Sequence, residues 1–396
     1  MKSVAGSLPE IFFAFLKLGL TSFGGPIAHL GYLRAELVTR RKWLDDAGYA
    51  DLVALCQFLP GPASSQVGFA LGVLRHRGVL GGLAAWTAFT LPSAILMIGF
   101  AYGSTALEGR WGAGLVHGLK LVAVAVVAQA VYGMARSLTP DRQRAAIALA
   151  AAVIVLFFST SAGQILSLLL GAAAGLWLCR SREHTEFVSH QFSISHRAGA
   201  VALILFLSLL VLLPAWAATG SNRAVELFDA FYRAGALVFG GGHVVLPLLQ
   251  AEVVPPGWIT NPVFLTGYGL AQAVPGPLFS FAAYLGALMP VSPNGVTGAL
   301  LALTALFLPG LLLVYGMLPF WDFLRQRRLV QAGMRGANAA VVGILAAALY
   351  DPLWTSAVLT PQDFAAALAG FLLLTVWSAP PILVVALLST TGIALG

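Results

Sequence analysis

The sequence predicts an all-α polytopic integral membrane protein with two homologous, inverted-topology repeats and broken or re-entrant helices. Three observations lead to this prediction. Of the 396 residues, 59% are hydrophobic and 9% are charged, and the mean hydropathy is +0.88. A soluble chain carries roughly a quarter charged residues. Apolar runs follow one another along the whole chain, and a Pro-Gly-Pro phrase interrupts two of them.

The apolar runs are close to the length of about 20 residues that a membrane helix needs. The first half has runs at 8–32, 47–74, 79–104, 112–134, 145–160 and 163–179. An unpaired run at 199–216 follows a polar linker. The second half has runs at 225–250, 262–286, 296–320, 334–350, 362–377 and 380–395. The first run contains Glu10 and Lys17 and has no small-residue cleavage site, so we expect a membrane segment and not a signal peptide.

An internal repeat divides the chain, because matching residues recur at an offset of 215 to 216 positions. The matches are Lys17 with Arg233, Phe23-Gly24-Gly25 with Phe239-Gly240-Gly241, Glu36 with Glu252, and Gln57…Pro60-Gly61-Pro62 with Gln272…Pro275-Gly276-Pro277. Such ordered self-similarity indicates duplication. The expected organisation is an N-terminal repeat at 1–180, a linker with a connecting transmembrane helix at 181–218, and a C-terminal repeat at 219–396.

The basic residues predict that the two repeats have opposite orientations. Connections at 34–42 and 75–77 are rich in Arg and Lys, whereas the matching connection at 250–261 has neither. Since cytoplasmic loops carry an excess of Lys and Arg, we expect 34–42 and 250–261 on opposite membrane faces. The run 47–74 would then be a re-entrant hairpin with Pro60-Gly61-Pro62 near its tip, mirrored in the second half. A single kinked spanning helix is the alternative.

The repeated helix breaks are the candidate substrate site. Proline lacks an N–H and cannot continue a helix, and in lipid a broken helix needs partners from protein or a water-filled cavity. Breaks at matching positions of two halves indicate a transporter site, and the N–H groups at a helix start bind anions. Close packing through small residues is the alternative. The candidate positions are Gly24, Gly25, Gln57, Pro60, Gly61, Pro62, Gly240, Gly241, Gln272, Pro275, Gly276 and Pro277.

Four charges at matching positions add to this candidate site. Lys17 and Arg233 lie inside apolar runs, where a cation is a functional hypothesis by default; each could instead extend to the interface. Two cations beside helix ends would suit a dianion. Glu36 and Glu252 are candidates for carrying coupling protons, with solvated helix-end charges as the alternative.

The sequence predicts no enzyme, no cofactor and no metal site. It has no G-x-x-x-x-G-K-[ST] loop and no H-E-x-x-H motif. Cys56 and Cys179 lack metal-ligand spacing, and His29 and His243 do not align in the repeat, so packed roles are expected for them. Basic residues punctuate the apolar runs and form no continuous face, which argues against nucleic acid as a partner.

The repeated Phe-Gly-Gly…Gln-x-x-Pro-Gly-Pro pattern resembles that of the chromate ion transporter family, long-chain two-half type, over nearly the whole chain. The resemblance implies a secondary active transporter in the bacterial inner membrane that exports chromate from the cytoplasm with the membrane ion gradient and confers chromate resistance. It also implies sulfate as a competing anion and the lipid bilayer as surroundings, and a homodimer is compatible with it. A sulfate or other oxyanion transporter and a passive anion channel are the alternatives, followed by a membrane enzyme.

Overall fold

The computed structural model of the protein confirms an all-α polytopic membrane protein. It describes residues 6–23, 25–103, 110–158, 161–179, 194–220, 222–239, 242–321, 323 and 327–395. No strand occurs within these ranges. Helices long and apolar enough to cross a membrane cover Val79–Gly103, Gly112–Leu138, His196–Ala217, Gly295–Phe320 and Arg328–Ala357.

In the first half, the helices follow the predicted runs, and the first two runs are broken. The run 8–32 forms α1 (Leu8–Thr21) and α2 (Gly25–Leu33), which continues into the π-helical segment η1 (Arg34–Arg40). The run 47–74 forms α3 (Asp46–Phe58) and α4 (Ala63–His76), separated at Pro60-Gly61-Pro62. The remaining helices are α5 (Val79–Gly103), α6 (Arg110–Leu138), α7 (Arg142–Phe157) and α8 (Ser161–Leu178).

In the second half, the same order recurs after the connecting helix α9 (His196–Ala217). Its first two runs are broken too, into α10 (Arg223–Ala236), η3 (Gly242–Val244) and α11 (Val245–Val253), then α12 (Asn261–Ala273), η4 (Leu278–Ser280) and α13 (Phe281–Ala287). The later elements are α14 (Gly295–Met317), η5 (Leu318–Phe320), α16 (Arg328–Ala348), η6 (Leu349–Trp354), α17 (Thr355–Ala357), α18 (Pro361–Thr375) and α19 (Pro381–Leu395).

Polar side chains fix several helix starts. Ser7 accepts a hydrogen bond from the backbone N–H of Glu10 at the start of α1, and Asp45 accepts one from Gly48 at the start of α3. Thr360 and Asp363 form a reciprocal capping box at the start of α18. These bonds satisfy N–H groups that have no partner inside the helix.

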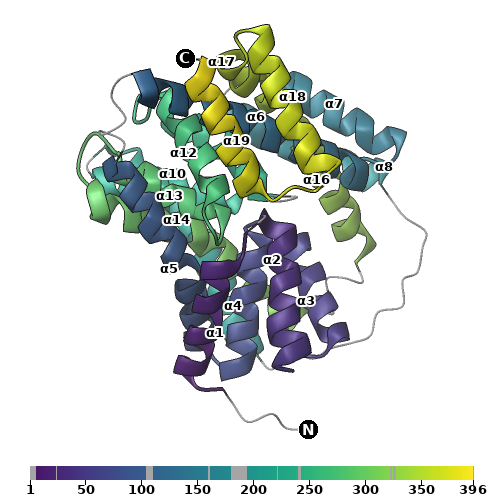
Figure 1. The fold of residues 1–396 in the computed structure, drawn as a ribbon. Coiled ribbons are helices and arrows are strands. Elements are labelled where there is room, and N and C mark those ends of the chain that lie inside the picture. Colours follow the sequence, from purple (N-terminus) through teal and green to yellow (C-terminus); the bar gives the residue numbers. More distant parts are fainter. Residues whose placement is uncertain are drawn as a thin grey trace.

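The two halves are interlocked by an exchange of helices. Within each half, the helices around the breaks pack together: α1 and α4 lie against α5, and α10 and α13 lie against α14. The later helices pack across the halves instead, with α6 against α18 and α19, and α16 against α7 and α8. Figure 1 shows these six later helices together in the upper part and α1 to α4 in the lower part. Neither half therefore forms a separate domain.

Small residues allow the exchanged helices to approach closely. A β-carbon at Gly118 of α6 would collide with the backbone of Leu388 in α19. At the corresponding position of the second half, a β-carbon at Gly336 of α16 would collide with the backbone of Gly171 in α8. Membrane helices associate through such small residues, because lipid provides no hydrophobic drive for them to pack. The helix pairs α6–α19 and α16–α8 therefore approach each other closely in the same way.

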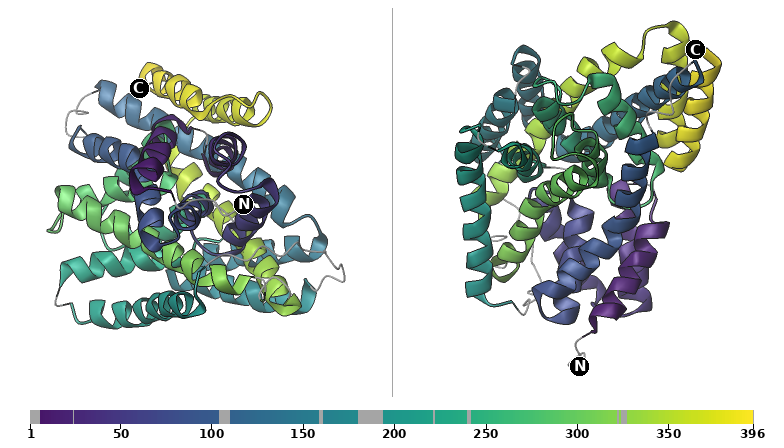
Figure 2. Two further views of the ribbon diagram at one scale, coloured as in Figure 1. Left: turned by 90° about the horizontal axis from the view of Figure 1, so that it is seen from below. Right: turned by 90° about the vertical axis from the view of Figure 1, so that its left-hand side faces the viewer.

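The connecting helix α9 lies outside the repeated pattern. It packs on α10 and α14, and its other face exposes Val201, Ile204, Leu207 and Val211. An exposed apolar surface of this kind indicates contact with lipid. Figure 2 shows α1 and α19 toward opposite ends of the molecule.

Candidate functional site

Each Pro-Gly-Pro break contacts the other half of the chain beside its glycine break. The backbone N–H of Gly61 donates to the carbonyl of Val238 at 2.6 Å, and that of Gly276 donates to the carbonyl of Ser22 at 2.9 Å. Ser22 directly follows α1, and Val238 lies at the equivalent position, 216 residues later. The four breaks thus meet as two crossings, Ser22–Gly276 and Val238–Gly61. Gly24, Gly240 and Gly241 lie outside the described residues.

Both crossings depend on glycine. Gly61 has φ +125° and Gly276 has φ +100°, a region that favours glycine because other residues carry a β-carbon. A β-carbon on Gly61 would lie 3.0 Å from the Cα of Gly310, and one on Gly276 would lie 3.1 Å from the Oγ of Ser93. Gly310 belongs to α14 and Ser93 to α5, so each break packs against the long helix of the opposite half.

Buried polar side chains gather at the Ser22–Gly276 crossing. The Nδ1 atom of His29 lies 3.5 Å from the Oγ atom of Ser64, and the ring of His29 packs edge-on against Phe89. Ser93, beside Gly276, donates to the carbonyl of Thr90 at 2.9 Å. The Ser and Thr side chains and His29 are all at least nine-tenths buried. Polar groups so deep in an apolar protein need hydrogen-bond partners.

Three hydroxyls in these segments lack such partners. The Oγ atoms of Ser22 and Ser65 and the Oγ1 atom of Thr90 are buried, and the described part of the chain offers no hydrogen bond to any of them. Burying an unpaired hydroxyl is unfavourable. Ser65 also lies in the first turn of α4, which starts at Ala63 without a side-chain cap, so the backbone N–H groups of that turn are open to a ligand. Together these groups can donate hydrogen bonds to an anion.

A side-chain amide bridges the two halves at the Val238–Gly61 crossing. The Nε2 atom of Gln66 donates to the carbonyls of Pro60 and Gly310, at 2.9 and 3.0 Å. Gln66 thereby ties the break of the first half to the other half. Sequence reasoning proposed Gln57 as an amide donor to the substrate, but Gln57 is exposed on α3. Its counterpart Gln272 is half-buried, and its buried Nε2 atom donates no hydrogen bond to the described residues.

The four charges predicted from the repeat pair in the same way in both halves. The Nζ atom of Lys17 lies 3.3 Å from an oxygen of Glu36. The two Nη atoms of Arg233 donate to the two oxygens of Glu252, at 3.0 and 2.9 Å. Each pair joins the helix before a glycine break to the segment after it. The cations are therefore not free charges, and each is held by the carboxylate that the repeat places opposite it.

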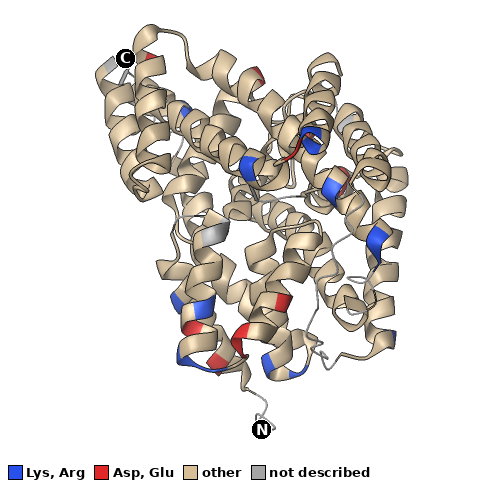
Figure 3. Ribbon diagram, turned by 90° about the vertical axis from the view of Figure 1, so that its right-hand side faces the viewer, with Lys and Arg blue, Asp and Glu red and all other residues tan. Residues whose placement is uncertain are grey.

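The two pairs have surroundings of opposite charge. Glu36 also accepts from Arg40 at 3.0 Å and Arg41 at 2.8 Å, so three cations surround one carboxylate. Figure 3 shows charged positions gathered at this end of the molecule, where the N-terminus lies. Arg233 also donates to Asp229 at 3.0 Å, so two carboxylates surround one arginine. The formal charges are +2 and −1.

Sequence reasoning missed Ser22, Thr90 and Asp229. Ser22 directly precedes the repeated Phe-Gly-Gly phrase, which is a signal that could have found it. Asp229 could not be found by comparing the halves, because position 13 holds phenylalanine. Within the described ranges, no group of three or more His, Cys, Asp or Glu has a metal-binding arrangement.

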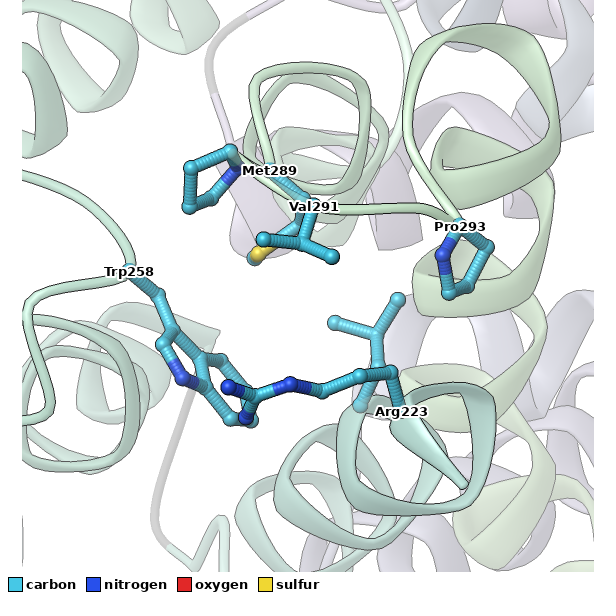
Figure 4. Close-up of a pocket in the computed structure, with 7 residues that line it drawn as sticks. Arg223, Trp258, Met289, Val291 and Pro293 are labelled. Carbon is cyan, nitrogen blue, oxygen red and sulfur yellow. The ribbon is translucent and has the colours of Figure 1, made fainter. Parts of the chain in front are cut away.

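Two cavities lie away from the crossings. One, of about 50 Å³, is lined by the start of α10 and the loops before α12 and α14, and Figure 4 shows the side chain of Arg223 alongside Trp258 in it. The other, of about 150 Å³, lies among α7, α8, α11 and α16 and includes Gln164. No described residue of the four breaks lines either of these two cavities.

Broken helices that meet between two interlocked halves define a multi-pass membrane protein of the transporter class. The chain belongs to the chromate transporter family: the family model described as "Chromate transporter" matches residues 9–176 and 225–393. These two matches confirm the resemblance to the two-half type.

Curated relatives match most of the chain. The "Chromate transport protein" of Pseudomonas aeruginosa is 28% identical over 372 residues, which are 90% of this chain and 83% of that protein. The "Probable chromate transport protein" of Synechococcus elongatus is 29% identical over 350 residues, 87% of this chain and 84% of that protein. No solved structure matches the chain.

Proposed function

We propose that the protein is a secondary active transporter that exports chromate from the cytoplasm with the membrane ion gradient and so confers chromate resistance. Membership of the chromate transporter family supports chromate as the substrate. The observation that carries the site is the meeting of four helix breaks beside buried hydroxyls without partners. A bacterial inner membrane is the location that fits this role.

The anion would bind at the breaks, at the Pro-Gly-Pro and glycine positions predicted from the repeat. Ser22, Ser65 and Thr90 would supply hydroxyl donors, joined by Gln272 and by the first turn of α4. Lys17 precedes Ser22 by five residues, roughly 7.5 Å along a helix. Its side chain is 53% exposed, so it can turn from Glu36 toward an anion at the crossing. Arg233 would play the matching part in the second half.

Glu36 and Glu252 would couple anion binding to protons. Each carboxylate is stabilised by a cation that the anion would compete for. A carboxylate that loses a neighbouring cation binds a proton more readily. An anion that displaces Glu252 from Arg233 would therefore promote proton uptake at Glu252. Glu36 would respond less, because Arg40 and Arg41 remain bound to it.

The membrane potential alone favours export of a dianion. Moving one charge across the membrane releases about 2.3 kcal/mol per 100 mV, so two charges release about 4.6 kcal/mol. Since about 1.4 kcal/mol corresponds to a factor of ten, an inside-negative potential of about 100 mV supports an outward gradient of more than a thousandfold. Export in this direction needs no nucleotide hydrolysis.

The lengths of the broken helices support re-entrant hairpins in inverted repeats. Helices α3 and α4 have 13 and 14 residues, so each is about 20 Å long, and they contact each other. Crossing the hydrocarbon core takes about 30 Å. A hairpin that enters and leaves on one face fits these lengths. Alternating access would then arise when the helices around the breaks move against the exchanged helices α6–α8 and α16–α19.

A site made of hydroxyls, N–H groups and cations recognises a tetrahedral dianion by charge and shape. Sulfate shares both with chromate, so sulfate would compete for the site. The test is chromate uptake into inside-out vesicles, with and without an uncoupler and with sulfate as competitor. Saturable uptake that collapses with the uncoupler is the expected result. Flux that does not saturate would indicate a channel, and accumulation of sulfate but not chromate would overturn the substrate.

A further inference from the structure

Asp229 and Glu252 share a single arginine near the break of the second half. Arg233 donates through its Nε atom to Asp229 at 3.0 Å and through both Nη atoms to Glu252 at 3.0 and 2.9 Å. The two carboxylates are only 5% and 11% exposed, and Arg233 is 27% exposed. One positive charge thus balances two negative charges in a mostly buried cluster.

Asp229 is the member of this cluster that is incompletely satisfied. Its Oδ2 atom accepts the bond from Arg233, but its Oδ1 atom is buried and accepts no hydrogen bond from the described residues. A buried carboxylate with one unpaired oxygen and an acidic neighbour is unfavourable as an anion. Adding a proton to Oδ1 removes the excess charge and leaves the bond to Oδ2 in place.

Among the described residues of α10 and the helices packed against it, Arg233 is the cation that interacts with Asp229. Helices α9, α11 and α14 contact α10. Their titratable residues are His196 and Arg197 in the first turn of α9, Glu252 in α11 and Tyr315 in α14. On α10 itself, Arg223 is paired with Glu226 at 2.6 Å, and the hydroxyl of Tyr232 donates to the carbonyl of Phe206. Arg233 is the cation that these helices place against Asp229.

We propose that Asp229 is a proton-binding site that controls the affinity of Arg233 for the transported anion. With Asp229 ionised, two carboxylates occupy the guanidinium, and the cluster charge of −1 repels a dianion. When Asp229 takes a proton from water, the cluster becomes neutral, and the Nε atom of Arg233 loses a charged competitor. Proton and dianion therefore favour each other's binding. This inference rests on the proposed function and refines its coupling step: Asp229, whose Oδ1 atom is unpaired, takes the proton ahead of Glu252, both of whose oxygens accept from Arg233.

The proposal gives the two repeats different tasks. The matching cluster of the first half has three cations around Glu36, and Phe13 stands where the second half has Asp229. The first half therefore attracts a dianion without needing a proton. A dianion that travels with one proton still carries one negative charge outward, so the inside-negative potential continues to favour export.

The test measures protons taken up when the purified wild-type protein binds an anion. Sulfate is added to protein in weakly buffered detergent solution near neutral pH, with a pH-indicator dye; sulfate is the probe because its own charge does not change there. We expect proton uptake approaching one per bound sulfate. Asp229→Asn should bind sulfate without taking up that proton, and Asp229→Glu should restore the uptake. Sulfate binding by the wild-type protein without proton uptake overturns the proposal.

Vesicle transport provides the second readout. Wild-type sulfate transport should rise severalfold from about pH 8 to about pH 6, whereas sulfate transport by Asp229→Asn should be nearly independent of pH. The matched control is Glu226→Gln on the same helix, which removes a pair with Arg223 and should keep the wild-type pH profile. Transport that does not depend on pH in the wild type overturns the coupling role and leaves the proposed function standing. Failure to transport either anion overturns both.

Discussion

The backbone N–H of Gly61 donates to the carbonyl of Val238, 2.6 Å away in the other half of the chain. The equivalent bond joins Gly276 to Ser22. These two bonds connect breaks that lie 177 and 254 residues apart in the sequence. They place the Pro-Gly-Pro break of each half beside the end of the first helix of the other half. If one half moves relative to the other, either these two bonds break or the bonded segments move together.

Gly61→Ala should reduce both stability and transport. The residue has φ +125°, and its β-carbon would lie 3.0 Å from the Cα of Gly310. Backbone strain of this kind costs about 1–3 kcal/mol. The measurement is thermal unfolding of the purified protein together with vesicle transport. Gly99→Ala on α5 is the control, because a β-carbon there meets nothing within 4 Å, and it should leave both properties unchanged. Equal stability and equal transport of the two variants would contradict a role for Gly61 at the contact with Val238.

Lys17→Ala and Arg233→Ala should differ sharply in stability. Without Lys17, Glu36 keeps Arg40 and Arg41, and the cost should be below about 1 kcal/mol. Without Arg233, two buried carboxylates lose their shared partner, which costs about 3–5 kcal/mol. Both variants should lose anion transport.

The comparison needs a third protein, because an unstable variant can lose transport for that reason alone. Combining Arg233→Ala with Asp229→Asn and Glu252→Gln removes the stranded charges and should recover stability but not transport. Stability is measured by thermal unfolding in detergent. Normal transport by Lys17→Ala combined with this triple variant would remove both cations from the anion site.

Cysteine labelling should place the two repeats in opposite orientations. Ala47→Cys in the first turn of α3 and Pro256→Cys after α11 both lie at exposed positions, and native Cys56 is buried. In a Cys179→Ser background, a membrane-impermeant maleimide applied to intact cells should label position 256 only. In inside-out vesicles, it should label position 47 only. Labelling of both from the same side would exclude inverted repeats.

The sequence predicts the helices better than it predicts their partners. Lipid forces every spanning segment to satisfy its own backbone, so apolar runs and Pro-Gly-Pro phrases predict helices and breaks such as the one between Phe58 and Ala63. The packing of α6 against α19 depends on a contact between Gly118 and Leu388. Contacts between helices that are far apart in the sequence leave no pattern in the local sequence. The exchange of helices between halves was therefore not predictable.

The residues of the candidate site were likewise only partly predictable from the sequence. Lys17 and Glu36 were found because a cation and a carboxylate recur at the matching positions 233 and 252. Asp229 has no acidic counterpart, because Phe13 stands at the matching position, so comparing the halves gives no signal for it. Ser65 and Thr90 are ordinary helix residues in the sequence. Their lack of hydrogen-bond partners is visible only once the surrounding helices are in place.

Ser22→Ala, Ser65→Ala and Thr90→Val should weaken transport without lowering stability. These hydroxyls are buried and have no hydrogen bond within the described chain, so removing them relieves an unfavourable burial and should leave the melting temperature equal or higher. If each donates one hydrogen bond to the anion, its loss costs about 1.4 kcal/mol, or roughly tenfold in affinity. The measurement is the concentration of chromate at half-maximal uptake.

Ser93→Ala is the matched control for these hydroxyls. Ser93 is equally buried on α5, but its hydroxyl donates to the carbonyl of Thr90 at 2.9 Å. Removing it should lower stability by about 1 kcal/mol and change the half-maximal chromate concentration little. The opposite pattern, with stable Ser93→Ala and destabilised Ser22→Ala, would show that the unpaired hydroxyls serve the fold. A hydroxyl whose removal weakens transport but not stability is one that binds the transported anion.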